Sequence, residues 1–117
     1  MSRYMLLLYA PEVDETEAAK RWAEMPLWDQ VTDSLREAGY WVSNSALAEP
    51  DTATTVRVRD DEVELTDGPF AVTKEILVGY YLLECPDLDA ALDAAARLPL
   101  ARYGSVEIRP LWEAPGS

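Results

Sequence analysis

The sequence predicts an α+β protein in which helices pack on one face of an antiparallel sheet. Strand-like and helix-like segments follow one another in the order strand, helices, strand, hairpin, strand, helix, strand, which suits this class. With 117 residues, 49% of them hydrophobic, the chain is long enough and apolar enough for one packed domain. We assign residues 1–112 to that domain and residues 113–117 to a short C-terminal tail.

The first part of the chain indicates one strand and two helices. The apolar run at residues 3–9 predicts the strand, and Asp14 followed by Glu17 has the spacing of a capping box at a helix start. Pro26 interrupts this helix and suits the first turn of a second one, which stops at Gly39. The apolar residues at helical spacing are Ala18, Trp22 and Met25 in the first helix and Leu27, Val31, Leu35 and Ala38 in the second.

A strand at residues 40–47 and a loop at residues 48–53 lead to a β-hairpin whose register can be written down. A two-residue turn at Asp60 and Asp61 pairs Arg59 with Glu62, Val58 with Val63, Arg57 with Glu64 and Val56 with Leu65. One face is then apolar and the other carries two opposite-charge pairs, so we interpret both arginines as structural. Because Asp-Asp is a weaker turn former than Asp-Gly, a loop longer by one or two residues is the alternative.

The last part of the chain indicates a long strand at residues 74–84, a helix capped by Asp87 and closed by Pro99, and a strand at residues 104–112. Pro110 in the last strand favours an edge position or a bulge. Residues 4–9 and 76–83 are apolar on both faces, whereas a sheet with helices on one side normally alternates. The sheet of a second copy is the economical cover for the other face, so we expect a homodimer.

Charge and composition exclude several function classes. The net charge is −12, from 22 acids and 10 bases, which disfavours binding to nucleic acids and to anionic membranes and is best explained by solubility. Cys85 is the only cysteine, and no signal peptide or membrane span is apparent, so we expect a cytoplasmic protein without disulfides. The chain has no histidine, which excludes Ser-His and Cys-His nucleophiles within it and makes a zinc site improbable. A carboxylate-only magnesium site at residues 60–62 is the alternative, but adjacent acids at a turn are usually solvated, so we expect no metal there. We also expect no cofactor.

Residues 66–75, TDGPFAVTKE, combine turn chemistry with ionisable groups and hold the first candidate site residues. Asp67 is either an Asx-type turn residue, with Gly68 supplying a positive φ, or an acceptor or general base at the mouth of a pocket. Phe70 anchors the turn on the core or gates a cavity. Lys74 and Glu75 point to opposite faces of a strand, and the one that points inward is the better candidate.

Three further side chains are candidates for ligand contact. Tyr80 and Tyr81 also point to opposite faces, so one is expected in the core while the other offers its hydroxyl to a ligand. Arg102 lies in the loop before the last strand, where it can bind a carboxylate-bearing substrate. The tryptophans at 22, 28 and 41 are expected between helices and sheet, and a flat aromatic ligand is the minority interpretation.

The segments TDGPFAVTKE, ATTVRVRD and LARYGSVEIRP, with RYMLLLY near the N-terminus and REAG before Tyr40, resemble the YCII-related proteins of the DGPF type over essentially the whole chain. The resemblance implies a ferredoxin-like fold that dimerises sheet to sheet into an α/β barrel, in a family often described as of unknown function. Relatives of the same fold include isomerases, lyases and monooxygenases, and members of this branch are often encoded beside alternative sigma factors. Other branches look like they use a His-Asp pair, whose histidine corresponds to about Trp28 here, so that proton relay cannot be transferred.

Three functional interpretations follow. The favoured one is a small-molecule-binding or accessory, regulatory homodimer without robust catalysis, with a modest apolar cavity between helices and sheet. The alternative is a lyase- or isomerase-type enzyme with Asp67 as base, Lys74 or Arg102 at a developing oxyanion, and a tyrosine as proton donor. The third is a structural module that contacts another protein through the acidic helix at residues 87–97.

Overall fold

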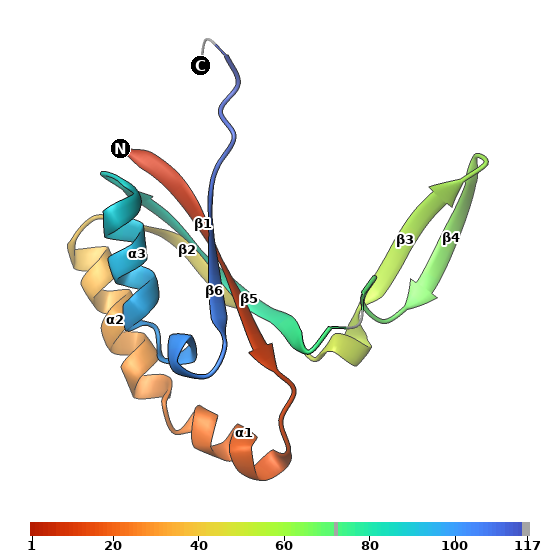
Figure 1. Cartoon of the computed structure of the whole chain (residues 1–117), viewed down its shortest axis with the longest axis horizontal. Coiled ribbons are helices and arrows are strands. Elements are labelled where there is room, and N and C mark those ends of the chain that lie inside the picture. Colours follow the sequence, from red (N-terminus) through yellow and green to blue (C-terminus); the bar gives the residue numbers. More distant parts are fainter. Residues whose placement is uncertain (72, 116–117) are drawn as a thin grey trace.

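A computed structural model describes residues 1–71 and 73–115, and it has helices on one face of a four-stranded antiparallel sheet (Figure 1). The sheet consists of β1 (Ser2–Pro11), β2 (Trp41–Ala46), β5 (Glu75–Cys85) and β6 (Ser105–Pro110), in the order β2-β5-β1-β6. The helices are α1 (Glu15–Trp22), α2 (Met25–Glu37) and α3 (Leu88–Arg97), with short 3-10 turns η1 (Pro50–Thr52) and η2 (Pro99–Arg102). The predicted α+β class is confirmed, and the strand order with its crossover helices matches a ferredoxin-like arrangement.

The predicted helix starts at Asp14 and Asp87 and the predicted stop at Gly39 are confirmed, whereas α1 already ends at Trp22 and Met25 belongs to α2. The carboxylates of Asp14 and Asp87 accept hydrogen bonds from the backbone N–H groups three residues later, at 2.8 and 2.9 Å, and so cap α1 and α3. Gly39 follows α2 with a φ of 79°, and its N–H donates to the carbonyl of Arg36 at 3.0 Å. The N–H of Tyr40 donates to the carbonyl of Leu35 at 2.9 Å, which completes a Schellman motif.

The core lies between the sheet and helices α2 and α3. Burial alternates along β1 and β5, and the side chains on the helix-covered face are Tyr4, Leu6, Leu8, Ala10, Tyr81, Leu83 and Cys85. The opposite face of these strands carries Met5, Leu7, Tyr9, Tyr80 and Leu82, which are only partly covered within one chain. This second apolar set is the feature from which the homodimer was predicted.

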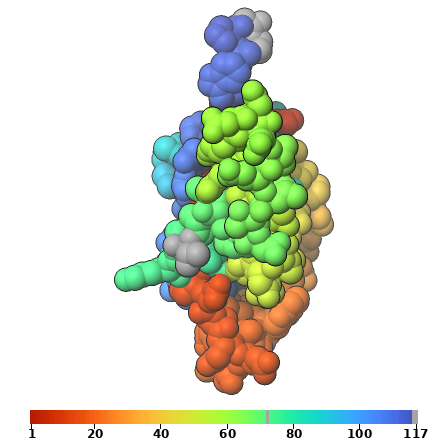
Figure 2. Space-filling model, turned by 90° about the vertical axis from the view of Figure 1, so that its right-hand side faces the viewer, coloured from red at the N-terminus to blue at the C-terminus, as the bar shows by residue number. Residues whose placement is uncertain are grey.

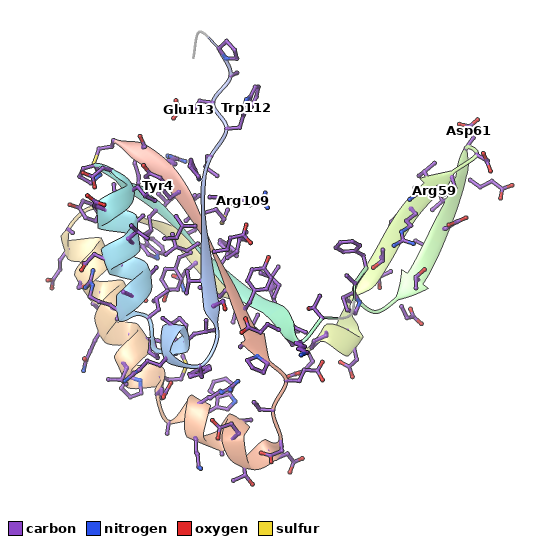
Figure 3. All side chains as sticks on the ribbon, in the orientation of Figure 1. Tyr4, Arg59, Asp61, Arg109, Trp112 and Glu113 are labelled. Atoms are coloured by element: carbon purple, nitrogen blue, oxygen red, sulfur yellow. The ribbon has the colours of Figure 1, made fainter. Side chains whose placement is uncertain are left out.

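Strands β3 (Thr54–Arg59) and β4 (Glu62–Asp67) form a separate two-stranded hairpin, which we call the arm. Its register agrees residue for residue with the prediction, and Asp60 and Asp61 have positive φ angles of 52° and 62°, as a type I′ turn requires. The arm projects on the side of the sheet opposite the helices, with Arg59 and Asp61 at its far end (Figures 1 and 3). The radius of gyration of 16.5 Å reflects this projection, since a compact chain of this length has about 13 Å.

The C-terminal segment extends beyond the fold. After β6, the residues that include Trp112 and Glu113 run away from the sheet (Figures 2 and 3), and Trp112 is exposed. The predicted tail at residues 113–117 begins within this segment, and residues 116–117 lie outside the described residues.

Four residues that were expected to face inward are exposed, namely Trp22, Met25, Leu27 and Ala38. Trp22 is 72% exposed, because α1 lies beside the end of the sheet and buries no residue. Leu27 is also largely exposed, and Thr32 rather than Leu27 joins Leu35 on the buried side of α2. The helical period was right, but the buried face of α2 is rotated by about one residue toward Trp28, which packs on the core.

Candidate functional site

A cavity of about 630 Å³ lies between α1, α2, the β2 edge of the sheet and the segment that follows β2. Its walls are mostly apolar and include two tryptophans, Trp22 and Trp28. The apolar residues that also line it are Leu8, Ala10, Val13, Ala18, Met25, Ala46, Leu47, Ala48, Pro50, Ile76, Leu77, Val78 and Leu100. Ligand sites of this size are typically apolar with a few convergent polar groups.

Four polar side chains of the cavity form one stripe of α2. Asp29, Thr32, Asp33 and Arg36 all line the cavity, and their spacing of three, four and seven residues places them on one side of a helix. Sequence reasoning missed this stripe. The signal was present, because these residues run parallel to the apolar stripe of the predicted helix, but a polar stripe beside an apolar one ordinarily faces solvent.

Thr32 and Tyr81 meet at the bottom of the cavity wall. Their hydroxyl oxygens lie 2.7 Å apart in a buried hydrogen bond, and Tyr81 is 3% exposed. The Tyr81 ring stacks on Trp28, with ring centroids 6.2 Å apart and an interplanar angle of 18°. Burial raises the pKa of Tyr81, and the negative charge of Asp29 raises it further, so this hydroxyl is neutral at physiological pH.

Both arginines that line the cavity are already engaged. The guanidinium of Arg21 lies 4.0 Å from the ring centroid of Tyr103, donates to the carbonyl of Pro11 at 3.3 Å, and is 3.7 Å from Glu17. That of Arg36 lies 4.4 Å from the ring centroid of Trp41 and 3.9 Å from the Asp33 carboxylate. Both cations thus lie beside aromatic rings and carboxylates of the same chain, although the buried Nε of Arg21 has no hydrogen-bond partner among the described residues.

The residues of the DGPF segment lie at the base of the arm, and none of them lines the cavity. Gly68 has the expected positive φ, 94°, its N–H donates to the carbonyl of Ala53 at 2.7 Å, and its carbonyl accepts from the Thr55 hydroxyl at 2.8 Å. Asp67 is exposed, and within the described residues no group donates a hydrogen bond to its carboxylate. Phe70 is exposed and does not anchor the turn on the core of this chain.

Among the remaining candidate residues, Tyr81 lines the cavity and the other four lie in different places outside its lining. Lys74 lines a second hollow of about 490 Å³ next to the arm base. Glu75 accepts a hydrogen bond from the Ser105 hydroxyl at 3.3 Å. Tyr80 lies on the uncovered face of the sheet, as the expected split from Tyr81 requires, and Arg102 is exposed at η2. The structure therefore brings one of the predicted residues, Tyr81, into the cavity.

The structure was also compared with the requirements for a metal site and for a membrane-spanning helix. In the part of the chain that the structure describes, no group of three or more Asp, Glu, Cys or His side chains is arranged to bind a metal ion. Within residues 1–71 and 73–115, no helix combines the length and the apolar character needed to cross a membrane.

Comparison with known proteins agrees with the resemblance seen in the sequence. The sequence profile of the YCII-related domain matches residues 2–115. The chain belongs to the YCII-related family. An uncharacterized protein of Rhizobium meliloti (strain 1021) is 38% identical over 112 residues, which cover 92% of this chain and 90% of that protein. Every residue that lines the cavity falls within the matched YCII-related domain.

Proposed function

We propose that this YCII-related protein binds a small molecule in the cavity between α2 and β2, as a cytoplasmic homodimer without robust catalysis. The observation that carries the proposal is the cavity of about 630 Å³. It combines apolar and aromatic walls with a short polar stripe, which is the composition expected of a ligand site. The buried Thr32–Tyr81 hydroxyl pair at its wall supplies a fixed polar feature for orientation.

The absence of histidine from the chain favours binding over proton-transfer chemistry. The lyase- or isomerase-type alternative requires Asp67 as a base in a cavity. Asp67 is exposed at the base of the arm and does not line the cavity, so this geometry gives that alternative no support.

A thermal-shift screen of a metabolite library tests the binding proposal. We expect compounds that raise the melting temperature of the wild-type protein and lose this effect in Ala48→Trp, which introduces an indole at the cavity wall. Ala101→Trp is the matched control, because Ala101 is exposed and lies outside the cavity lining. Circular dichroism checks that both variants fold. Ligands that stabilise all three proteins equally would contradict this location of the site.

The homodimer is supported by two apolar surfaces on the same side of the chain. The uncovered sheet face carries Met5, Leu7 and Leu82, and the arm projects beside it with its own apolar face exposed (Figure 1). Because monomeric proteins rarely expose large contiguous apolar patches, we propose that a second copy covers this side. Self-association also has to overcome the repulsion between two chains of net charge −12, so it requires a large apolar contact.

Sedimentation velocity at micromolar concentration tests the dimer. We expect a dimer for the wild type and a monomer for Leu82→Glu, which inserts a charge on the uncovered sheet face. Leu92→Glu, on the half-exposed outer surface of α3, is the control and should stay dimeric. A wild-type monomer at these concentrations would exclude the proposal.

A further inference from the structure

The hydrogen-bonding capacity of the Thr32–Tyr81 pair is only partly used. Two hydroxyl groups carry two protons, and one hydrogen bond of 2.7 Å between them uses one proton. Among the described residues, no other hydrogen bond to either hydroxyl is present. Tyr81 is 3% exposed and Thr32 is 9% exposed, so the second proton lies in a nearly dry environment at the cavity wall. An unmet buried donor is costly, which makes this proton a strong attachment point for an acceptor.

The charged side chains around the Thr32–Tyr81 pair favour a cationic ligand over an anionic one. Arg21 and Arg36 each have a carboxylate within 4 Å, Glu17 and Asp33 respectively. Asp29 also lines the cavity, and within the described part of the chain it has neither an ion pair nor a side-chain hydrogen bond. The acidic side of the cavity is therefore the side left without a counterion.

The electrostatic balance at Tyr81 points the same way. Burial is the main cause of the raised pKa of Tyr81, and the nearby carboxylate of Asp29 also raises it. Trp28, stacked on Tyr81, adds an aromatic face that attracts cations. An anionic ligand would meet the carboxylate of Asp29, while both arginines that line the cavity already lie within 4 Å of a carboxylate.

We propose that the cavity selects a flat, apolar ligand that carries a cationic amine, bound by Asp29, and a hydrogen-bond acceptor, bound by the free proton of the Thr32–Tyr81 pair. This inference rests on the proposed binding function and specifies its ligand class. Asp29 acts as the counterion, and Trp28 forms the flat wall beside it. The neutral acceptor can be a carbonyl or a hydroxyl oxygen, since both accept from a hydroxyl donor.

Three indole probes of similar size separate the two contacts: tryptamine is cationic, N-acetyltryptamine is neutral with a carbonyl, and indole-3-propionate is anionic. Isothermal titration at low salt should give tryptamine an affinity about tenfold higher than indole-3-propionate. In Asp29→Asn, the affinity for tryptamine should fall about fivefold or more, whereas the affinity for N-acetyltryptamine should not change. Asp89→Asn on α3 removes the same charge far from the cavity lining and should change neither affinity.

The acceptor contact is tested with the double variant Thr32→Val with Tyr81→Phe, because each single variant would keep one hydroxyl whose proton is free. The double variant has neither hydroxyl, and we expect its affinity for N-acetyltryptamine to be about threefold to tenfold lower than that of the wild type. An unchanged affinity would mean that water, not the ligand, takes the free proton, and would overturn this part. Equal binding of cationic and anionic probes, or an unaltered preference in Asp29→Asn, would overturn the charge assignment. Failure of all three probes to bind at millimolar concentration, together with no hit in the metabolite screen, would instead reject the binding function itself.

Discussion

Strands β1 and β5 and the arm strands β3 and β4 have similar residues but different surroundings. Both pairs are antiparallel, and both carry apolar side chains on at least one face. In β1 and β5, one face is buried under α2 and α3, so that Leu83 is 0% exposed. In the arm, Val58 is 57% exposed and Leu65 is 68% exposed. An isolated two-stranded hairpin is only marginally stable in water, so the contact that we propose with a second copy would stabilise the arm.

This difference separates two contributions to the structure, local strand pairing and the burial of apolar side chains. The register of the arm follows from local pairing and from the Asp60-Asp61 turn, which act between neighbouring residues. The stability of the sheet comes from burial between residues distant in the sequence. A segment can therefore have a well-defined pairing and still lack the apolar cover that stabilises it.

Truncation of one leucine in each region should give the largest contrast. Leu83→Ala removes a fully buried side chain, and we expect it to lower the free energy of unfolding by about 3–4 kcal/mol. Leu65→Ala should lower the free energy of unfolding by less than about 1 kcal/mol under conditions in which the protein is monomeric. Urea denaturation monitored by tryptophan fluorescence measures both. Similar losses in monomeric protein would mean that the arm packs on its own chain.

Gly79 in β5 tests how closely the sheet core is packed. A Cβ atom at this position would lie 2.7 Å from the carbonyl oxygen of Ser45 in β2. Gly79→Ala should therefore separate β2 from β5 and destabilise the protein by about 2 kcal/mol. It should also increase hydrogen exchange of the β2 amides, because that edge strand pairs only with β5 in the described sheet. Wild-type exchange in β2 would contradict this interpretation.

The apolar face of the arm should matter for association rather than for the fold of one chain. We expect Val58→Ser combined with Leu65→Ser to weaken the proposed dimer by about 1–3 kcal/mol, because less apolar surface is removed from water on association. Sedimentation equilibrium gives the dissociation constant. Thr66→Ser with Glu64→Gln is the control, because both residues lie on the opposite, charged face of the arm. An unchanged dissociation constant in the double serine variant would exclude the arm from the dimer contact.

The core tyrosine predicts a pH dependence that the arm, which has no tyrosine, cannot produce. Burial raises the folded-state pKa of Tyr81 above its ordinary value of 10.0, so its contribution to stability is complete below pH 10. That contribution is lost as the pH rises through the raised pKa, because the unfolded state releases the proton first. Above pH 10, the free energy of unfolding of Tyr81→Phe should therefore fall less steeply with pH than that of the wild type. Burial also raises the pKa values of Tyr103 and Cys85, so these two groups contribute to the slope that remains.

The smallest expected effect is at the arm turn. Asp61 has a φ of 62°, a conformation that glycine adopts without steric cost. Asp61→Gly should stabilise the closed hairpin by about 0.5–1 kcal/mol, visible as slower hydrogen exchange of the arm amides. Global unfolding should change little, because the arm is separate from the sheet. A matching rise in global stability would show that the arm and the sheet unfold together.

The sequence by itself determined the elements that depend on neighbouring residues. The α+β class, the helix caps at Asp14 and Asp87, the stop at Gly39 and the register of the arm were all predicted, since each follows from spacing within about ten residues. Tyr80 and Tyr81 were likewise assigned to opposite faces, because side chains alternate along a strand. The family resemblance rests on the same local motifs and is confirmed by the match over residues 2–115.

Only the tertiary structure decided which of these residues meet. The distinctive DGPF segment lies at the base of the arm, while the cavity is built by α2, β2 and β5, whose contributing residues are unremarkable in the sequence. Thr32 and Tyr81 are 49 positions apart, and no local pattern predicts that their hydroxyls share a hydrogen bond. Burial, exposure and the unpaired charge of Asp29 are properties of packing in three dimensions, where distant segments exclude water from one another.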